Sequence, residues 1–327
     1  KYNAQLSCGR VQTPTLAIIA KREEEIRNFR PKAYWGLTAR TSKPALTLTW
    51  QDKKSGGMRS FDRDRMEGLQ KSLRDQQVRI TKVKKTPKKT MAPLLYDLTE
   101  LQRDANKRFG YSAKETLNIM QRLYENHKVL TYPRTDSRYL SSDVADTIHD
   151  RLAACGTGPY RKLAGKLSKN VWTKKASFIN DGKVTDHHAI IPTVEIARTD
   201  LSALPSGERD VLALIAMRLL CATGQTHRFE AVTVVLDCAG HSFTAKGKTV
   251  LQAGWKEIER LYRMGLKQAE LEKEDPADAA LPELTQGQTF EPVAAGVREG
   301  KTSPPKHYTD VIFCERKEWI GIEERSS

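Results

Sequence analysis

A tyrosine and an arginine stand two positions apart in the string TYPRTDS, as Tyr132 and Arg134. A tyrosine hydroxyl has a pKa of about 10 and is a weak nucleophile until a neighbouring group favours the phenolate. The Arg134 guanidinium could favour that phenolate, or could neutralise charge developing on a phosphorane-like transition state. The pair is therefore compatible with attack on a phosphate ester. Taken alone, however, Tyr132 is one of ten tyrosines, and a buried structural tyrosine is the simpler interpretation.

Two adjacent histidines, His187 and His188, stand in the string DHHAIIPT. Adjacent histidines rarely share one metal ion, and no HExxH spacing lies nearby, so a metal site is a poor interpretation. A histidine in a basic groove can hydrogen-bond a phosphate oxygen. The alternative is one histidine satisfied in the core and the other exposed to solvent.

A glycine-containing loop precedes the first expected helix. Free N–H groups and the positive end of the helix dipole make such an N-terminus a ready phosphate site. Most glycine-containing turns before helices nevertheless bind nothing, so the loop alone is a weak indication. Its residues are Ser7, Cys8, Gly9, Arg10, Val11 and Gln12.

Composition narrows the class of protein. The chain has 327 residues with a formal net charge of +15, which favours a polyanionic partner such as nucleic acid, although a generally basic protein remains the alternative. The five cysteines are far apart with no CxxC pair, so we expect neither a zinc ribbon nor disulfides, and a reducing cytoplasm. No apolar run approaches the roughly 18–20 residues that cross a bilayer. No signal segment follows Lys1, so a secreted or membrane-embedded protein is not expected.

Hydrophobic periodicity predicts strands on both sides of a helical block. A helix is expected from Thr13 as cap to Phe29, and a cap at Ser112 starts a further helix. The block between residues 97 and 222 is predicted to be helical, including 211–220. Extended segments are predicted at 34–40, 45–50, 78–85 and 232–238, with a turn at Gly240, a partner strand from Phe243, and a solvated basic connector containing Lys84, Lys85, Lys88 and Lys89. The fold class is α+β, in which the two strand-rich flanks form one sheet domain.

Four strings occur in one order along the chain: QLSCGRVQTPTLAII, APLLYDLTELQRDANKRFGYSAKETL, TYPRTDS and DHHAIIPT. In this order and at about this spacing they resemble the type IA DNA topoisomerases, most like bacterial topoisomerase III. The resemblance runs from about Tyr2 to Thr309. Four matching strings in one order are far more specific than any one of them, and they outweigh the simpler interpretations above.

The resemblance implies a role for each candidate residue. Tyr132 is similar to the nucleophile that attacks a DNA phosphodiester, giving a 5′-phosphotyrosyl link and a free 3′-hydroxyl. Arg134 would stabilise the pentavalent phosphorus, and His187, rather than His188, would contact the phosphate. Ser7 to Gln12 would hold the single strand beside the site. Because the covalent link keeps the energy of the broken bond, no ATP is needed.

The family carries its Mg²⁺-binding acidic residues in a Toprim domain ahead of the SxGRVQ segment, and this chain begins at that segment. No DxDxE-type triplet occurs here, so we expect no metal ligands in the chain and no activity without the Toprim domain. The resemblance further implies single-stranded DNA and underwound duplex DNA as partners, no membrane, a monomer, and a cytoplasmic, nucleoid-associated location. The segment after Thr309 does not resemble the family's continuation.

The resemblance also predicts a β-strand arch with an inserted helical domain that carries the active-site tyrosine. The expected divisions are a helical segment at 1–32, the first part of the arch at 33–93, the helical active-site domain at 94–228, the second part of the arch at 229–310, and a divergent tail at 311–327.

Two other functions compete with a strand-passing enzyme. A non-catalytic fragment that only binds single-stranded DNA would keep the basic groove and the tyrosine but lack the metal site. A rolling-circle relaxase also uses tyrosine on DNA, but it needs a His-hydrophobic-His motif. The adjacent pair His187 and His188 lacks that spacer.

Overall fold

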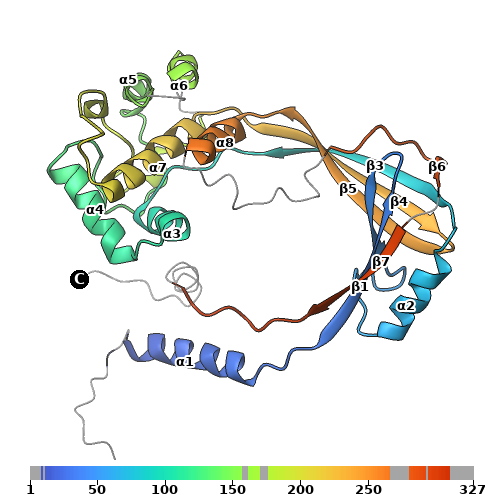
Figure 1. Ribbon diagram of the computed structural model, residues 1–327. Coiled ribbons are helices and arrows are strands. Elements are labelled where there is room, and N and C mark those ends of the chain that lie inside the picture. Colours follow the sequence, from blue (N-terminus) through green and yellow to red (C-terminus); the bar gives the residue numbers. More distant parts are fainter. Residues whose placement is uncertain are drawn as a thin grey trace, which may run out of the picture. The chain divides into compact units, whose positions relative to one another are not determined.

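The computed structural model describes Gly9 and residues 12–156, 161–169, 176–265, 280–291 and 294–309. Their contacts form two compact units, and each is described by itself below (Figure 1). The sheet unit takes in the described residues up to Lys89, the segment Arg228–Gln252 and the described residues from 280 to His307. The helical unit takes in the described residues of Thr90–His227, residues 253–265, and residues 308 and 309.

The sheet unit is built on an antiparallel sheet with the strand order β6-β3-β4-β5-β2-β1-β7. Segments far apart in sequence meet in it, since β7 pairs with β1 along its whole length, as the blue and red strands of Figure 1 show. The sheet and the helices of the second unit confirm the predicted α+β class. The strands are β1 (Ala33–Thr41), β2 (Leu46–Gln51), β3 (Val78–Thr90), β4 (His227–Cys238), β5 (His241–Gln252), β6 (Thr289–Phe290) and β7 (Ala294–Lys301).

The predicted hairpin around Gly240 is confirmed. Every second residue of β4 from Val232 to Cys238 is buried, and Leu236 lies opposite the buried Phe243 of β5. Gly240 has φ +78°, a left-handed conformation that glycine adopts without steric penalty. One face of the hairpin thus forms the core of the sheet unit.

Helix α2 (Arg63–Ser72) packs its buried Met66 into the same core, and the sequence pattern did not reveal it. Most of its side chains are polar, and its N-cap, Asp62, accepts a hydrogen bond from the Arg65 amide. A short helix with one buried apolar residue has too little periodicity to predict.

The four lysines of the predicted basic connector are exposed, as expected, but the strand does not end at Lys85, because β3 continues to Thr90 through all four of them. Strand pairing uses the main chain, so this part of β3 can be extended while its lysine side chains remain in solvent. Lys85 lies 4.0 Å from the Glu230 carboxylate on the neighbouring strand β4.

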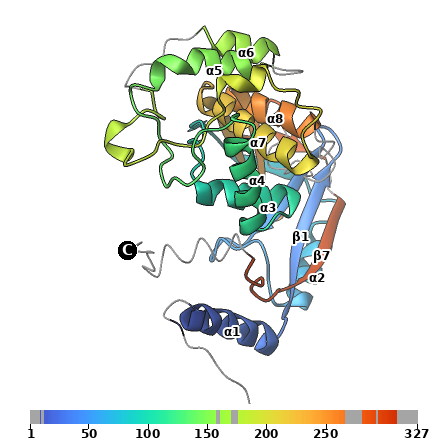
Figure 2. The same ribbon diagram turned by 90° about the vertical axis from the view of Figure 1, so that its left-hand side faces the viewer.

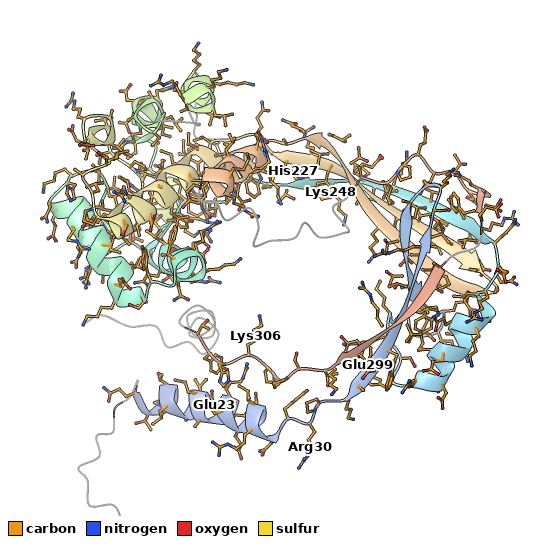
Figure 3. The ribbon with its side chains drawn as sticks, viewed as in Figure 1. Glu23, Arg30, His227, Lys248, Glu299 and Lys306 are labelled. Carbon is orange, nitrogen blue, oxygen red and sulfur yellow. The ribbon has the colours of Figure 1, made fainter. Side chains whose placement is uncertain are left out.

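Helix α1 (Gln12–Asn28) buries no side chain, and the segment 302–307 hydrogen-bonds to it and to Lys32 just after it. The Arg22 guanidinium donates to the Lys306 carbonyl at 3.0 Å, and His307 Nδ1 lies 2.6 Å from Glu23 Oε1. Figure 3 shows Glu23 and Lys306 side by side where segment and helix meet. The helix begins at Gln12, so the prediction of Thr13 as the cap is wrong: Thr13 lies in the first turn, where its amide donates to the Gly9 carbonyl.

Six α-helices lie in the described part of the helical unit, and they are labelled in Figure 2. Asp97 accepts a hydrogen bond from the Glu100 amide at the start of α3, and Ser112 accepts one from the Glu115 amide at the start of α4. The predicted cap at Ser112 is thereby confirmed. The helices are α3 (Leu98–Phe109), α4 (Ala113–Glu125), α5 (Ile148–Ala154), α6 (Arg161–Leu167), α7 (Ser206–Ala222) and α8 (Trp255–Gly265).

Helix α7 is buried on nearly every side and forms the centre of this unit's core. Helix α8 packs against it, and the Trp255 amide donates to the Gln225 carbonyl at 2.8 Å. Residues 255–265 therefore belong with the helices in this chain, whereas 229–310 was expected to be part of the arch. No helix in the described ranges is long and apolar enough to cross a membrane.

Candidate active site

The strings TYPRTDS (residues 131–137, called the nucleophile string below) and DHHAIIPT (residues 186–193, called the histidine string below) run side by side in the helical unit. Leu130 and Pro192 form an antiparallel bridge, and the Thr131 amide donates to the Ile191 carbonyl at 3.0 Å. The Thr193 amide closes this short ladder on the Val129 carbonyl at 2.9 Å. Two motifs far apart in the sequence are thus brought together by main-chain hydrogen bonds.

The ring of Tyr132 lies against that of His187. Their centroids are 4.2 Å apart with an angle of 36° between the planes. Tyr124 of α4 meets Tyr132 from another side, edge to face, at 5.7 Å. Tyr132 is half-buried and His187 is exposed, so part of the pair is open to solvent.

Arg134 is exposed, and no carboxylate in the described ranges pairs with its guanidinium. Nor does any contact among the described residues join it directly to Tyr132. An exposed guanidinium that pairs with no carboxylate among the described residues is able to act as a bidentate donor to a phosphate. By contrast, Arg103 and Arg108, two cations of α3 that could also have met a DNA backbone, are paired with Glu100 and Glu259.

His188 behaves differently from its neighbour. It is half-buried, and its Nδ1 lies 2.7 Å from the Ala189 carbonyl. Burial lowers the pKa of His188 below its usual value, with a smaller opposing effect from the Ala189 hydrogen bond. The pair is therefore divided into an exposed histidine that meets Tyr132 and a half-buried one whose pKa is lowered.

A buried polar network that the sequence analysis did not identify lies next to the histidine string. The Tyr96 hydroxyl bonds to Asp104 at 2.5 Å, and Arg218 reaches both groups while its guanidinium lies 4.0 Å from the Tyr96 ring centroid. Burial raises the pKa of Tyr96 well above its usual value. The Tyr96 carbonyl accepts a hydrogen bond from the Ile190 amide at 2.8 Å, so the network is joined to the histidine string. No local pattern links these positions, since they come together only in the fold.

The loop from Ser7 to Gln12 falls mostly outside the described residues. Ser7, Cys8, Arg10 and Val11 are not among them, and the structure bears on Gly9 and Gln12 alone. Gly9 donates its amide to the Thr13 hydroxyl at 3.3 Å, and Gln12 is exposed at the start of α1. The loop's predicted contact with DNA stays a prediction.

The chain's described residues contain no group of three histidine, cysteine, aspartate or glutamate side chains placed to hold a metal ion. Mg²⁺ prefers carboxylate oxygens, usually from more than one acidic residue, with water and phosphate completing the shell. The residues that the structure describes do not fit that ion.

Comparisons with known proteins agree on one family. A family model described as DNA topoisomerase matches residues 1–315. The chain is 48% identical over 310 residues to DNA topoisomerase 3 of Bacillus subtilis (strain 168), covering 95% of this chain and 41% of that protein. It is 45% identical over 318 residues to DNA topoisomerase 3 of Bacillus thuringiensis (strain Al Hakam), covering 97% and 42%.

The structural comparison concerns the fold alone. Full-length topoisomerase I from Thermotoga maritima superposes with a TM-score of 0.72 at 23% identity, covering 98% of this chain and 50% of that one. The chain belongs to the type IA DNA topoisomerases. Within that family its relatives are the bacterial topoisomerases 3, of which it spans about two fifths of the length.

Proposed function

We propose that this chain carries the nucleophile half of a type IA topoisomerase, with Tyr132 as the residue that attacks DNA. The observation that carries the proposal is the contact between the rings of Tyr132 and His187, two positions that lie in separate family strings. Arg134, two residues after Tyr132, is exposed and has no carboxylate partner in the described ranges. A nucleophile, a donor and a cation close together in sequence or in contact support the proposal that one phosphate binds among them.

The reaction follows from these groups. The Tyr132 oxygen loses its proton and forms a bond to phosphorus, while the bond from phosphorus to the 3′ oxygen breaks and that oxygen takes up a proton. Arg134 neutralises charge on the equatorial oxygens, and His187 donates to a phosphate oxygen. One phosphoester replaces another, so the reverse step reseals the strand without ATP.

The substrate we propose is single-stranded DNA, including the unpaired regions of underwound duplexes. The net charge of +15 supports a polyanionic partner. The segment Ser7 to Gln12 would hold the strand beside the site. The enzyme would act as a monomer on nucleoid DNA in the cytoplasm, relaxing or decatenating it.

Following the family resemblance, the metal ligands would come from a Toprim domain, which the sequence of this chain does not resemble. The resemblance also leaves a second candidate function, in which the isolated chain binds single-stranded DNA and does not cleave it. Both candidates share the DNA-binding surface and differ only in chemistry.

The test is covalent capture of a labelled single-stranded oligonucleotide with Mg²⁺, with and without a separately supplied Toprim domain. An adduct on Tyr132 only when that domain is added supports the proposal and the need for the second part. Tight binding with no adduct in either mixture supports the non-cleaving alternative. Failure to bind the oligonucleotide at all contradicts both.

A further inference from the structure

The tripeptide of Tyr132, Pro133 and Arg134 is bracketed by two threonines, Thr131 and Thr135. Each forms a hydrogen bond between its side-chain hydroxyl and the main chain of the histidine string. Thr131 Oγ1 accepts from the Ile191 amide at 3.0 Å, and Thr135 Oγ1 donates to the His187 carbonyl at 2.9 Å. The reactive side chains thus lie on a short span fixed at both ends.

The two threonines are not equivalent. Thr131 also pairs with Ile191 through its own amide, so the strand stays attached there without the hydroxyl. For the His187 main chain, the hydroxyl of Thr135 is the one hydrogen-bond partner found in the described part of the chain. Loss of that hydroxyl would therefore release the backbone of the residue whose ring contacts Tyr132.

Thr135 is also placed to resist movement. The residue is 7% exposed, and its Oγ1 accepts from the Ser137 amide at 3.1 Å while donating to the His187 carbonyl. Its carbonyl accepts the Leu98 amide, at the start of α3, at 3.0 Å. One buried residue thereby joins the nucleophile string, the histidine string and a capped helix.

We propose that Thr135 is a positioning residue, whose buried hydroxyl fixes the His187 main chain and so holds the His187 ring against Tyr132. The inference rests on the proposed function for its consequence in catalysis, but its structural part concerns this chain alone. A side chain displaced by about 1 Å can slow a reaction on the order of 100-fold, so such an anchor matters for the rate more than for DNA affinity.

The structural part is tested on the isolated chain by NMR of the histidine ring protons, with the His187 signal assigned by its loss in His187→Gln. Stacking on Tyr132 shifts that signal away from the position of a free imidazole. Thr135→Val keeps the shape and removes the hydroxyl, so the signal should move toward the free position. Thr135→Ser keeps the hydroxyl and should restore it.

Thr193→Val is the matched control. Thr193 ends the histidine string, and its hydroxyl also donates to a main-chain carbonyl, that of Lys128, at 2.6 Å. In this variant the His187 signal should stay in place. If Thr135→Val does not fold, Thr135→Cys, with a weak donor of similar size, should move the signal part of the way. A folded Thr135→Val or Thr135→Cys with an unmoved signal, or a Thr135→Ser signal that moves as far, overturns the proposal.

The catalytic consequence is tested by covalent capture with the added Toprim domain. Thr135→Val should lower the rate of adduct formation by about 10- to 100-fold while leaving oligonucleotide affinity within about twofold. An unchanged rate overturns the role in catalysis. If the unmodified chain forms no adduct, the proposed function has failed, and the NMR comparison still decides the role of Thr135.

Discussion

Tyr132 and His187 contact each other ring to ring at 4.2 Å, although one follows α4 and the other belongs to the segment 187–193, whose main chain hydrogen-bonds to residues 129–131. The adjacent histidines lie in different environments: His187 is exposed beside the tyrosine, and His188 is half-buried against the Ala189 carbonyl. Of the two histidines, His187 is therefore the one that meets both Tyr132 and solvent.

Replacing Tyr132 by phenylalanine should abolish covalent capture and leave single-strand binding nearly intact. The ring that packs on His187 and Tyr124 is kept, so the fold and the groove are kept, and only the attacking oxygen is lost. Gel detection of the adduct and fluorescence anisotropy of a labelled oligonucleotide measure the two properties. Tyr124→Phe, which removes the neighbouring hydroxyl, is the control and should still form the adduct. A large loss of binding in Tyr132→Phe would mean a structural tyrosine.

Single-strand affinity should fall steeply with salt, since phosphate contacts release counterions. Each contact to single-stranded DNA contributes about −0.7 to the slope of log K against log salt. Arg134→Ala should flatten that slope by about 0.7 if the guanidinium meets a phosphate. Arg260→Ala, which removes an exposed arginine already paired with Glu257 on α8, should leave the slope unchanged. A flat salt dependence of the unmodified chain would count against a phosphate-binding groove.

The sequence predicted the elements whose side chains alternate or repeat strongly, such as β4 with its buried Val234 and Leu236, and the cap at Ser112. It missed what depends on distant partners. Strand β3 could not be predicted beyond Lys85 because its lysines are exposed and only main-chain pairing keeps it extended.

The candidate site divides in the same way. Tyr132, Arg134 and His187 could be named from their strings, yet no local signal placed one ring against another. The network of Tyr96, Asp104 and Arg218 could not be found, because each residue taken alone is an ordinary member of an amphipathic or buried segment. Hydrogen bonds between segments become visible only once the fold brings them together.

Acidification below about pH 6.5 should destabilise the helical unit through His188. Burial lowers the pKa of His188 in the folded chain below its usual value of 6.5, so in this window the unfolded chain binds more protons. Stability therefore rises with pH through the window and falls as the pH drops, until the folded-state pKa is also passed. Thermal melting of the intact chain between pH 7.5 and pH 5, in steps of about half a unit, measures the effect.

The comparison variant is His188→Gln, which cannot acquire that proton. The difference in melting temperature between the unmodified chain and the variant should shrink, or change sign, as the pH is lowered. Asp143 and Arg151 act on His188 with opposite signs, and His187 adds a further repulsion, so the same difference should be taken at fixed salt. A difference that does not vary with pH would contradict the assigned burial effect.

Gly254, just before α8, should tolerate no side chain. It has φ +57°, and a Cβ there would meet the main-chain oxygens of Gln225 and Thr226, the latter at 2.7 Å. Gly240 has a similar φ of +78°, but a Cβ at that position meets nothing within 4 Å. The two glycines thus share a left-handed backbone, and they differ in whether an added Cβ would collide with the main chain.

Alanine at Gly240 should lower the free energy of unfolding by about 1–2 kcal/mol, the usual penalty of a left-handed conformation for a residue with a Cβ. Alanine at Gly254 carries the same penalty and must also push apart the turn through which the Trp255 amide reaches the Gln225 carbonyl, so its loss should be distinctly larger. Urea denaturation followed by tryptophan fluorescence compares the two variants, since Trp255 reports on this turn. Equal losses would show that the turn at Gln225 yields freely, and that close packing against Gly254 does not fix the start of α8.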